Sequence, residues 1–500
     1  MVSAASRAAA LAASPRTADA LMPAAVLASF IALSTQAGLF FDGDMYFLIA
    51  TGRDIIANGL STTDPLSSHE GLPYLSQQWL TCVVDAAAYD AFGRAGVESI
   101  YMALTAASAA FLWKASARYA GKKALGLRSG LLVAAACVLS MLMTRSTPRA
   151  FDAIALTACL LSAATYLDGG PKRALAAVPA CSLALANLHG SMWTVALMPA
   201  ACALLDWRAK GKRAPLLAAL AAGSLAACAN PYGPGMLTYV FASLSAPALS
   251  AFGIGELSPA SANTFAGWPA LAMPAAFWWM RRGYPGPSPD PLKRWRVRME
   301  DALLVGLWAG SLASVRVCFL LYTAAAMVLS SAIEARPPAA GARPSKAMLA
   351  VNAATAATLA CVLAACALST HPQADATEKQ AEQAACVQAL EDAGVEPGAC
   401  GYASFNEGAY LEFMGYRPYM DARAELWCPE VNGGDDIAGE FLDMRTGKIP
   451  LSELLARHDF EFAVISADEQ DYDTARQMEI AGMDEAYRSD LYAVWVRREG

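Results

Sequence analysis

The sequence predicts an α-helical polytopic membrane protein with about eleven transmembrane helices, followed by a C-terminal extracytoplasmic α/β domain. Of the 500 residues, 56% are hydrophobic and only 16% are charged, whereas about 25% is usual in soluble globular proteins. The charge is also divided unevenly. Residues 371–500 hold 27 Asp and Glu against 10 Lys and Arg, and residues 1–370 hold 17 against 27. We therefore expect a transmembrane domain over 1–370 and a polar tail that is long enough to bury a core of its own.

Apolar runs in the first 370 residues define the expected transmembrane helices, each of which needs roughly 20 mainly apolar residues, or somewhat fewer within a bundle. The runs are 20–40, 96–113, 129–143, 151–167, 174–187, 190–206, 214–229, 264–280, 301–315, 317–333 and 347–369. The first run exceeds the apolar core of a usual signal peptide, so we interpret it as an uncleaved span. Two further runs, 79–93 and 236–252, are apolar enough to be extra spans or interfacial helices.

Positive charge gathers in alternate loops, namely those after the second, fourth, sixth, eighth and tenth spans. Loops of this kind mark the cytoplasmic side of a membrane protein. With the N-terminus cytoplasmic, eleven crossings place the acidic tail outside. Because the basic residues form short clusters between apolar runs, we expect no nucleic-acid partner. The loops without basic clusters face outward in this topology, and they hold most of the polar residues that can form a site.

The first outer loop, residues 41–95, begins with two carboxylates, Asp42 and Asp44. A carboxylate that is partly desolvated at the bilayer surface can have its pKa raised toward that of a useful general base. Two carboxylates can also share a divalent cation such as Mg or Mn, although the sequence establishes no cofactor. The competing interpretation is an Asx-type helix cap, because Asp-Gly is common turn chemistry. Asp64 and Gln78 are further candidates for substrate binding in this loop.

Several polar residues interrupt the apolar runs at other outer loops. Arg149 follows the third span and Arg316 stands between two apolar runs, where a guanidinium suits a lipid phosphate. The alternatives are snorkelling and an internal ion pair. Other outer-loop residues are candidates to orient a sugar or a phosphate, with tight turns as the competing explanation: Asn187, His189, Asn230, Tyr232 and Glu256.

The tail is expected to contain a flexible linker over 371–385 and an α/β domain over 386–500. Strand-like runs are 399–404, 417–421, 461–466 and 491–496, and helical patterns are 406–413, 436–444, 451–457 and 473–481. The second strand ends in alternating charges, Asp421, Arg423 and Glu425. Such a strand end can hold ligand groups or can be a solvated edge. A pair among Cys386, Cys400 and Cys428 can oxidise if the tail lies outside the cytoplasm.

Several familiar signatures are absent from the sequence, which has no Walker loop, no GxSxG and no CxxC motif. The sequence therefore carries none of these usual signatures of nucleotide-driven chemistry or thiol redox chemistry.

Taken in order, the outer-loop motifs resemble those of bacterial polytopic proteins related to the C-superfold (GT-C) glycosyltransferases, which use polyprenyl-phosphate-linked sugars. The matching segments cover nearly the whole chain: Asp44 to Gly52, Asp64 to Ser67, Gln78 to Leu80, Pro148-Arg149, Asn187 to Gly190, Asn230 to Gly233, Glu256 to Pro259 and Asp421 to Glu425. Two departures stand out. The usual Arg-Pro appears as Pro148-Arg149, and the tail has Asp-Ala-Arg where Asp-Gly-Arg is typical.

The resemblance implies transfer of a sugar from a polyprenyl-phosphate donor to a glycan, lipid or protein acceptor, outside the bacterial cytoplasmic membrane. It favours Asp44 as the general base, with Asp42 supporting it or sharing a cation. Arg149 and Arg316 would hold the lipid phosphate, and the polar groups at Asn187, His189 and Asn230 would orient donor or acceptor. The alternative is a non-enzymatic envelope-assembly scaffold or a lipid-handling or transport protein, in which Asp44 only caps a helix.

Overall fold

The computed structural model describes residues 15–36, 38–144, 146, 148–246, 252, 257–261, 267–283, 296–335, 371–403, 405–467, 469–470 and 473–498. They belong to two compact units. The helical unit comprises Met1–Phe40, Ser99–Asn230 and Gly255–Thr370, and the α/β unit comprises Phe41–Glu98, Pro231–Ile254 and His371–Gly500. Of the expected features, the span 347–369 and Glu256 lie outside the described residues.

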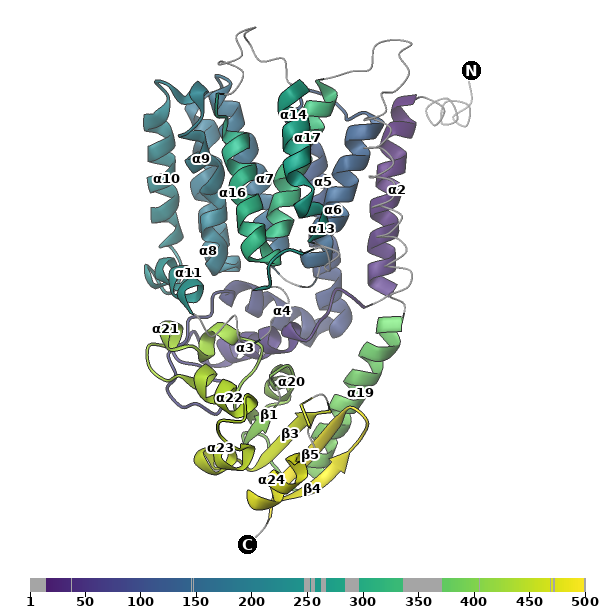
Figure 1. Cartoon of the computed structure of the whole chain (residues 1–500), viewed down its shortest axis with the longest axis vertical. Helices are drawn as coiled ribbons and strands as arrows, with labels where there is room; N and C mark the ends of the chain where they lie inside the picture. Colours follow the sequence, from purple (N-terminus) through teal and green to yellow (C-terminus); the bar gives the residue numbers. More distant parts are fainter. Residues whose placement is uncertain are drawn as a thin grey trace. The chain divides into compact units, whose positions relative to one another are not determined.

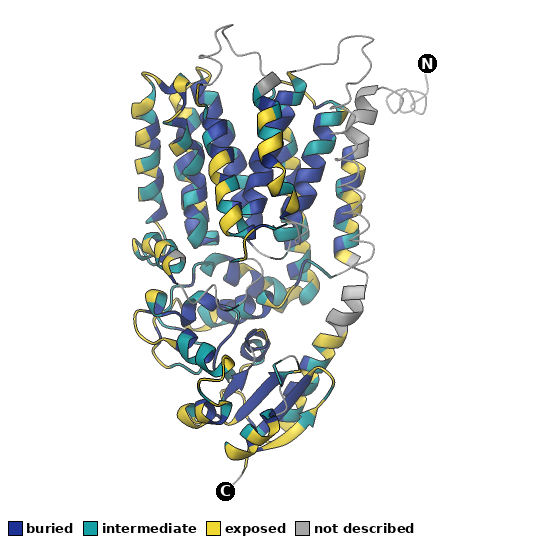
Figure 2. Ribbon diagram, in the orientation of Figure 1, coloured by how far each residue is buried: buried dark blue, intermediate teal, exposed yellow. Residues whose placement is uncertain are grey.

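The helical unit consists of α-helices (Figure 1), with short 3-10 segments between some of them. Its elements are α2 (Pro15–Gln36), α5 (Arg94–Tyr119, which begins in the α/β unit), α6 (Leu127–Thr144), α7 (Arg149–Leu167), η1 (Lys172–Ala176), α8 (Ala177–Leu188), η2 (Gly190–Ala196), α9 (Met198–Ala203), η3 (Trp207–Ala209), α10 (Arg213–Ala227), α13 (Trp268–Leu271), α14 (Met273–Gly283), α16 (Met299–Ala313), η5 (Val315–Val317) and α17 (Cys318–Glu334). Helix α17 packs against α6, α7 and α16, and most of its residues are buried (Figure 2).

Four segments of the described chain are long and apolar enough to cross a membrane: Arg94–Tyr119, Leu127–Thr144, Arg149–Leu167 and Val315–Glu334. Shorter apolar helices cover Pro23–Thr35, Gly190–Ala203 and Arg213–Ala227. The chain is thus an integral membrane protein, as expected. The count of eleven spans and the orientation of the chain stay predictions.

The α/β unit contains a five-stranded sheet in the order β2-β1-β3-β5-β4. Strand β1 pairs in parallel with β2 and β3, whereas β5 pairs antiparallel with β3 and β4. The elements are α3 (Asp44–Asn58), α4 (Trp79–Phe92), α11 (Gly235–Ser245), α19 (His371–Asp392), β1 (Cys400–Ala403), α20 (Gly408–Phe413), β2 (Arg417–Pro418), η6 (Ala424–Trp427), α21 (Pro429–Asn432), α22 (Ile437–Arg445), α23 (Leu451–His458), β3 (Phe462–Ser466), α24 (Thr474–Ile480), β4 (Met483–Arg488) and β5 (Tyr492–Arg497). Each of the four expected strands and four expected helices of the tail therefore has a counterpart.

Three features of this unit differ from the expectations. Strand β4 was not expected, because its sequence MDEAYR is rich in charged residues. In the structure these residues are mostly exposed, as is usual at the edge of a sheet. The stretch expected as a flexible linker, 371–385, forms most of helix α19. The boundaries also differ, because the first loop and the segment Pro231–Ile254 belong to the same compact unit as the tail. Contacts between segments far apart in sequence produce this grouping, and they leave no local signal.

Candidate functional site

The two carboxylates of the first outer loop lie where α3 begins. The Oδ1 atom of Asp42 accepts a hydrogen bond from the backbone N–H of Asp44, at 3.1 Å. This is the Asx-type contact of the competing interpretation, and it gives Asp42 a role in stabilising the start of the helix. Asp44 is half-buried in the first turn of α3, where the helix dipole favours a negative charge. The two acids therefore occupy different environments.

Helix α3 is held in place by the tail. Its residues Met45, Tyr46, Leu48 and Ile49 are buried. The ring of Tyr46 packs edge-on against that of Tyr410 in α20, with 4.9 Å between the ring centroids. Aromatic pairs of this geometry contribute beyond their buried area. The position of Asp44 thus depends on the C-terminal residues of the chain.

A buried ion cluster joins the first loop to the tail. Arg423 donates from Nε to Asp421 at 2.6 Å, from Nη1 to Asp64 at 2.6 Å, and from Nη2 to Glu412 at 2.7 Å. The side chain of Arg423 is 4% exposed and those of the three acids are 0% exposed. A solvated strand end is therefore the wrong interpretation for Asp421 and Arg423. Each nitrogen of this guanidinium is already bound to a carboxylate.

Local backbone structure assembles the cluster. Asp421 Oδ1 accepts a hydrogen bond from the Arg423 backbone N–H at 2.9 Å, which fixes the turn that follows β2. Helix α20 begins at Gly408, whose absent side chain permits close approach, because a Cβ there would lie 2.0 Å from the Met420 carbonyl oxygen. One turn later in α20, Glu412 reaches Arg423. A side chain at position 408 would thus displace one acid of the cluster.

The three acids around Arg423 do not share one protonation behaviour. Burial alone raises the pKa of Asp64, but the charge of Arg423 and hydrogen bonds from Ser67 and Arg423 outweigh it and hold the pKa below its ordinary value. Burial raises the pKa of Glu412 well above its usual range, against the lowering effect of Arg423, and Asp421 and Asp64 add to the rise. Moreover, Glu412 Oε2 is buried and accepts no hydrogen bond from any described donor. Of the three acids, Glu412 is thus the one whose surroundings most favour the protonated form.

The remaining tail candidate, Glu425, connects three segments of the chain. Its Oε1 accepts hydrogen bonds from Gln77 Nε2 at 2.8 Å and from the Tyr239 hydroxyl at 3.1 Å. The expected substrate-binding residue Gln78 lies next to Gln77 at the N-cap of α4, and its Oε1 is buried without a described donor. Tyr232 is in the same unit, where burial raises the pKa of its hydroxyl and the backbone of Ser76 is its hydrogen-bond partner.

In the helical unit, a residue that the sequence analysis did not single out brings two expected residues together. Asp152 Oδ2 lies 2.8 Å from His189 Nδ1, and the two side chains are 0% and 9% exposed. Arg149 is one turn before Asp152 in α7 and is close enough for their charges to interact. Its Nη1 donates to the Met143 carbonyl at 3.2 Å. A carboxylate bound to one ring nitrogen orients an imidazole and sets which nitrogen carries the proton.

The other expected residues of the helical unit contact backbone. Asn187 Nδ2 donates to the carbonyls of Leu183 and Ala229, at 2.9 and 3.0 Å. Asn230 Nδ2 donates to the Ala227 carbonyl at 2.6 Å, at the end of α10. Half-buried Arg316 lies in η5, where its backbone N–H donates to Ser314 Oγ at 3.3 Å. These contacts match the competing explanation of structural turns for the two asparagines.

The expected site residues thus divide between the two units. Asp42, Asp44, Asp64, Gln78, Tyr232, Asp421, Arg423 and Glu425 belong to the α/β unit; Arg149, Asn187, His189, Asn230 and Arg316 belong to the helical unit. In each unit one acid that was not among the expected site residues completes a cluster: Glu412 beside Arg423, and Asp152 beside His189. Asp152 had a local signal, because it stands one helical turn after Arg149 in an apolar run. Glu412 had none.

The structure also bears on the expected metal site and on the expected disulfide. In the described ranges, no three His, Cys, Asp or Glu side chains are grouped so as to hold a metal ion. A cation shared by Asp42 and Asp44 stays a prediction. Cys386, Cys400 and Cys428 are free thiols, with Cys400 partly exposed and the other two buried.

The fold of the chain is similar to that of a protein of known structure over nearly the full length of both chains. ArnT from Cupriavidus metallidurans in the apo state is 13% identical, with a TM-score of 0.50 over 93% of this chain and 96% of that chain. The same protein bound to undecaprenyl phosphate is 12% identical, with a TM-score of 0.51 over 95% and 97% of the two chains. No protein-family model and no curated protein matches the chain. The resemblance to the GT-C glycosyltransferases, expected from the outer-loop motifs, is confirmed at the level of the fold over nearly the full length of the chain.

Proposed function

We propose that the chain is a membrane glycosyltransferase that moves a sugar from a polyprenyl-phosphate-linked donor to a glycan, lipid or protein acceptor outside the cytoplasm. The observation that supports it most strongly is the nearly full-length similarity in fold to ArnT, which has been solved with undecaprenyl phosphate bound. A shared fold alone does not determine an activity. The residues at the start of α3 and in the Asp152 and His189 pair supply the chemical part of the proposal.

Asp44 acts as the general base in this proposal. It would take the proton from the acceptor hydroxyl as that oxygen attacks the anomeric carbon of the donor, while the bond from that carbon to the lipid phosphate breaks. Asp42 is exposed, whereas Asp44 is half-buried in the first turn of α3, and this partly desolvated acid is the better candidate of the two. Removing a positioned general base costs about 10²- to 10⁴-fold in rate.

Arg149 and Arg316 bind the phosphate of the lipid in this proposal. Their guanidinium groups donate hydrogen bonds to it and stabilise the negative charge that develops on the leaving phosphate. Asp152 keeps His189 in one orientation through the 2.8 Å contact with Nδ1. With the proton on Nδ1, the Nε2 atom of the ring can accept a hydrogen bond from a hydroxyl of the donor or the acceptor.

The test compares Asp44→Asn with Asp42→Asn in the purified full-length protein, reconstituted into vesicles of native membrane lipid that supply acceptors. Undecaprenyl-phosphate-linked sugars carrying a radiolabel serve as donors, and the loss of label from the donor lipid is measured. We expect Asp44→Asn to lose at least about 100-fold in rate and Asp42→Asn to lose far less.

Binding of undecaprenyl phosphate, measured by native mass spectrometry, is the control and should persist in Asp44→Asn. If Asp44→Asn transfers sugar at the wild-type rate, the residue is a helix cap and not the base. If the wild-type protein binds undecaprenyl phosphate but transfers no sugar from any donor, the scaffold or lipid-handling alternative is favoured.

A further inference from the structure

A groove of about 540 Å³ runs along the helical unit between the η1–α8 segment and α10. This volume is within the range of ligand sites, roughly 300–1,000 Å³. Apart from Lys172, every lining residue is Ala, Pro or Leu: Leu175, Ala176, Pro179, Ala214, Pro215, Ala218 and Ala219. The side chains that line the groove are therefore apolar apart from one cation.

The groove exists because the side chains at this end of the two helices are short. Further along, α8 and α10 are in direct contact, where Ser182 Oγ donates to the Gly223 carbonyl at 2.9 Å. At Ala176, Ala214 and Ala218, the side chains are too small to fill the space between the helices. Leu217 of α10 is 55% exposed, as expected for a helix surface in contact with lipid chains. An apolar group such as an acyl chain suits such a groove better than a polar ligand.

Lys172 lines the groove, and three more cations lie close to its lining residues in sequence, where η1 and α10 begin. Lys172 and Arg173 open η1, Arg213 opens α10, and Lys210 precedes it; all four are exposed. Within the described part of the chain, none of the four forms an ion pair or a side-chain hydrogen bond. An exposed group of four cations near one apolar groove favours an anionic head group.

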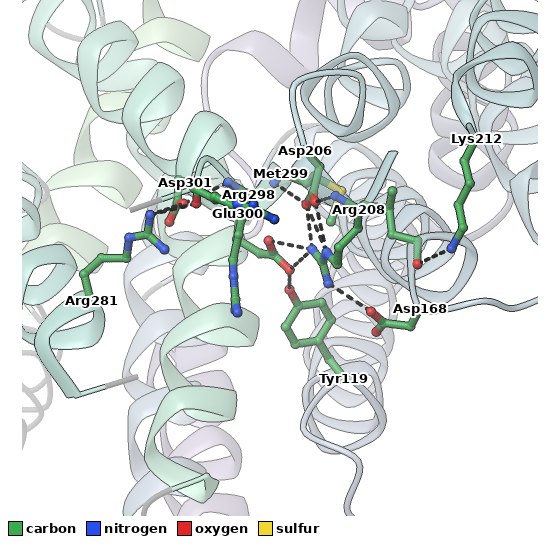
Figure 3. A network of polar contacts seen from close by, with 12 residues as sticks. Tyr119, Asp168, Asp206, Arg208, Lys212, Arg281, Arg298, Met299, Glu300 and Asp301 are labelled. Atoms are coloured by element: carbon green, nitrogen blue, oxygen red, sulfur yellow. Dashed lines mark hydrogen bonds and ion pairs between the residues drawn. The ribbon is translucent and has the colours of Figure 1, made fainter. Parts of the chain in front are cut away.

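The neighbouring basic residues behave differently, as Figure 3 shows. Arg208 donates to Asp206 at 2.7 Å, to Glu300 at 3.0 Å and to Asp168 at 2.9 Å. Lys212 Nζ donates to the Leu167 carbonyl at 2.6 Å. Arg208 and Lys212 are thus bound within the protein. The four exposed cations named above remain available to a ligand.

We propose that this groove binds an anionic glycerophospholipid of the surrounding membrane, with one acyl chain between α8 and α10 and the phosphate near Lys172 and Arg213. Basic pockets between membrane helices on the cytoplasmic side recognise such head groups. The loops that carry these cations are the ones that the charge pattern predicts to be cytoplasmic. The proposal does not depend on the transferase activity.

The test is native mass spectrometry of the detergent-solubilised full-length protein, titrated with phosphatidylglycerol or phosphatidylcholine. We expect the wild type to bind phosphatidylglycerol roughly tenfold more tightly or better. The double variant Lys172→Ala with Arg213→Ala should lose this preference. Ala218→Phe, which fills the groove without changing the charge, should weaken binding of phosphatidylglycerol while preserving the fold, as checked by thermal unfolding.

The matched control is Lys122→Ala with Lys123→Ala, which removes two exposed cations from another basic loop of the helical unit. If the control variant loses the preference equally, the binding is general surface attraction and the proposal fails. It also fails if Ala218→Phe binds like the wild type. Displacement of phosphatidylglycerol by equimolar undecaprenyl phosphate would assign the groove to the polyprenyl lipid instead.

Discussion

Arg423 is a residue whose role depends entirely on its partners. In the sequence, Arg423 is one of three alternating charges at the end of a strand. In the structure, its guanidinium forms ion pairs with three carboxylates. Removing one partner of a buried ion pair is strongly destabilising, because it leaves a charge buried without compensation. Three acids surround one arginine here, and burial together with Asp421 and Asp64 raises the pKa of Glu412, which predicts that Glu412 is the protonated acid of the cluster.

The Glu412→Gln variant tests this protonation. Because the pKa of Glu412 is raised in the folded state, the folded protein keeps a proton that the unfolded chain releases above the ordinary value of 4.5. The free energy of unfolding therefore falls as pH rises from the ordinary pKa of the unfolded chain to the raised pKa of the folded protein. Over this interval Glu412 contributes a decrease of up to about 1.4 kcal/mol per pH unit. Asp64 acts in the opposite sense, because its pKa is lowered and its stabilisation is lost only as pH falls below the ordinary value of 3.8.

Thermal unfolding of the full-length protein between about pH 5 and pH 8 measures the effect of Glu412. We expect Glu412→Gln to match the wild type near pH 5 and to become relatively more stable as pH rises. Glu453→Gln is the control, because Glu453 forms an exposed pair with Arg457. Parallel curves for wild type and Glu412→Gln would show that Glu412 is ionised in the folded protein.

At the scale of elements, α3 and α4 approach each other unusually closely. A Cβ at Gly52 would lie 2.0 Å from the carbonyl oxygen of Cys82 and 2.7 Å from the Cβ of Ala86. Backbone atoms cannot yield as a flexible side chain can. The first outer loop is thus organised around a helix pair that requires glycine at this position.

We expect Gly52→Ala to separate α3 from α4 and to destabilise the α/β unit by about 1–3 kcal/mol, the usual cost of overpacking. The melting temperature of the purified protein reports the loss. Gly434→Ala is the matched control in the same unit, because its added Cβ would meet nothing within 4 Å. A melting temperature of Gly52→Ala equal to that of the control would show that the two helices can move apart freely.

At the scale of the whole molecule, the α/β unit is assembled from three separate stretches of the chain. The first loop runs along β2, where the Ser68 N–H donates to the Pro418 carbonyl at 3.0 Å and Arg417 Nε donates to the Ser67 carbonyl at 3.0 Å. His69 Nε2 lies 2.8 Å from the Tyr419 carbonyl. These contacts require the first loop and the tail to lie on the same side of the membrane.

This requirement makes the topology testable. Single cysteines introduced at exposed Glu70 and exposed Asp459, in a background without other reactive thiols, should both react with a membrane-impermeant maleimide in intact cells. A cysteine at Lys122 should react only after the cells are permeabilised. If the Glu70 and Asp459 positions differ in accessibility, either the contacts between loop and tail or the odd number of crossings is wrong.

The sequence by itself determined the class of the protein and most elements of the tail, because apolar runs and alternating strands are local patterns that hydrophobic burial imposes on nearby residues. It also singled out Arg149 and His189, which the structure brings near the same acid, Asp152. The tertiary structure alone decided which groups meet. Asp64 and Arg423 are 359 residues apart, and Glu412 reaches them only because Gly408 lets α20 lie against the end of β2. Pairing across such distances depends on the complete packing of the chain, so the buried cluster could not be predicted from any local pattern.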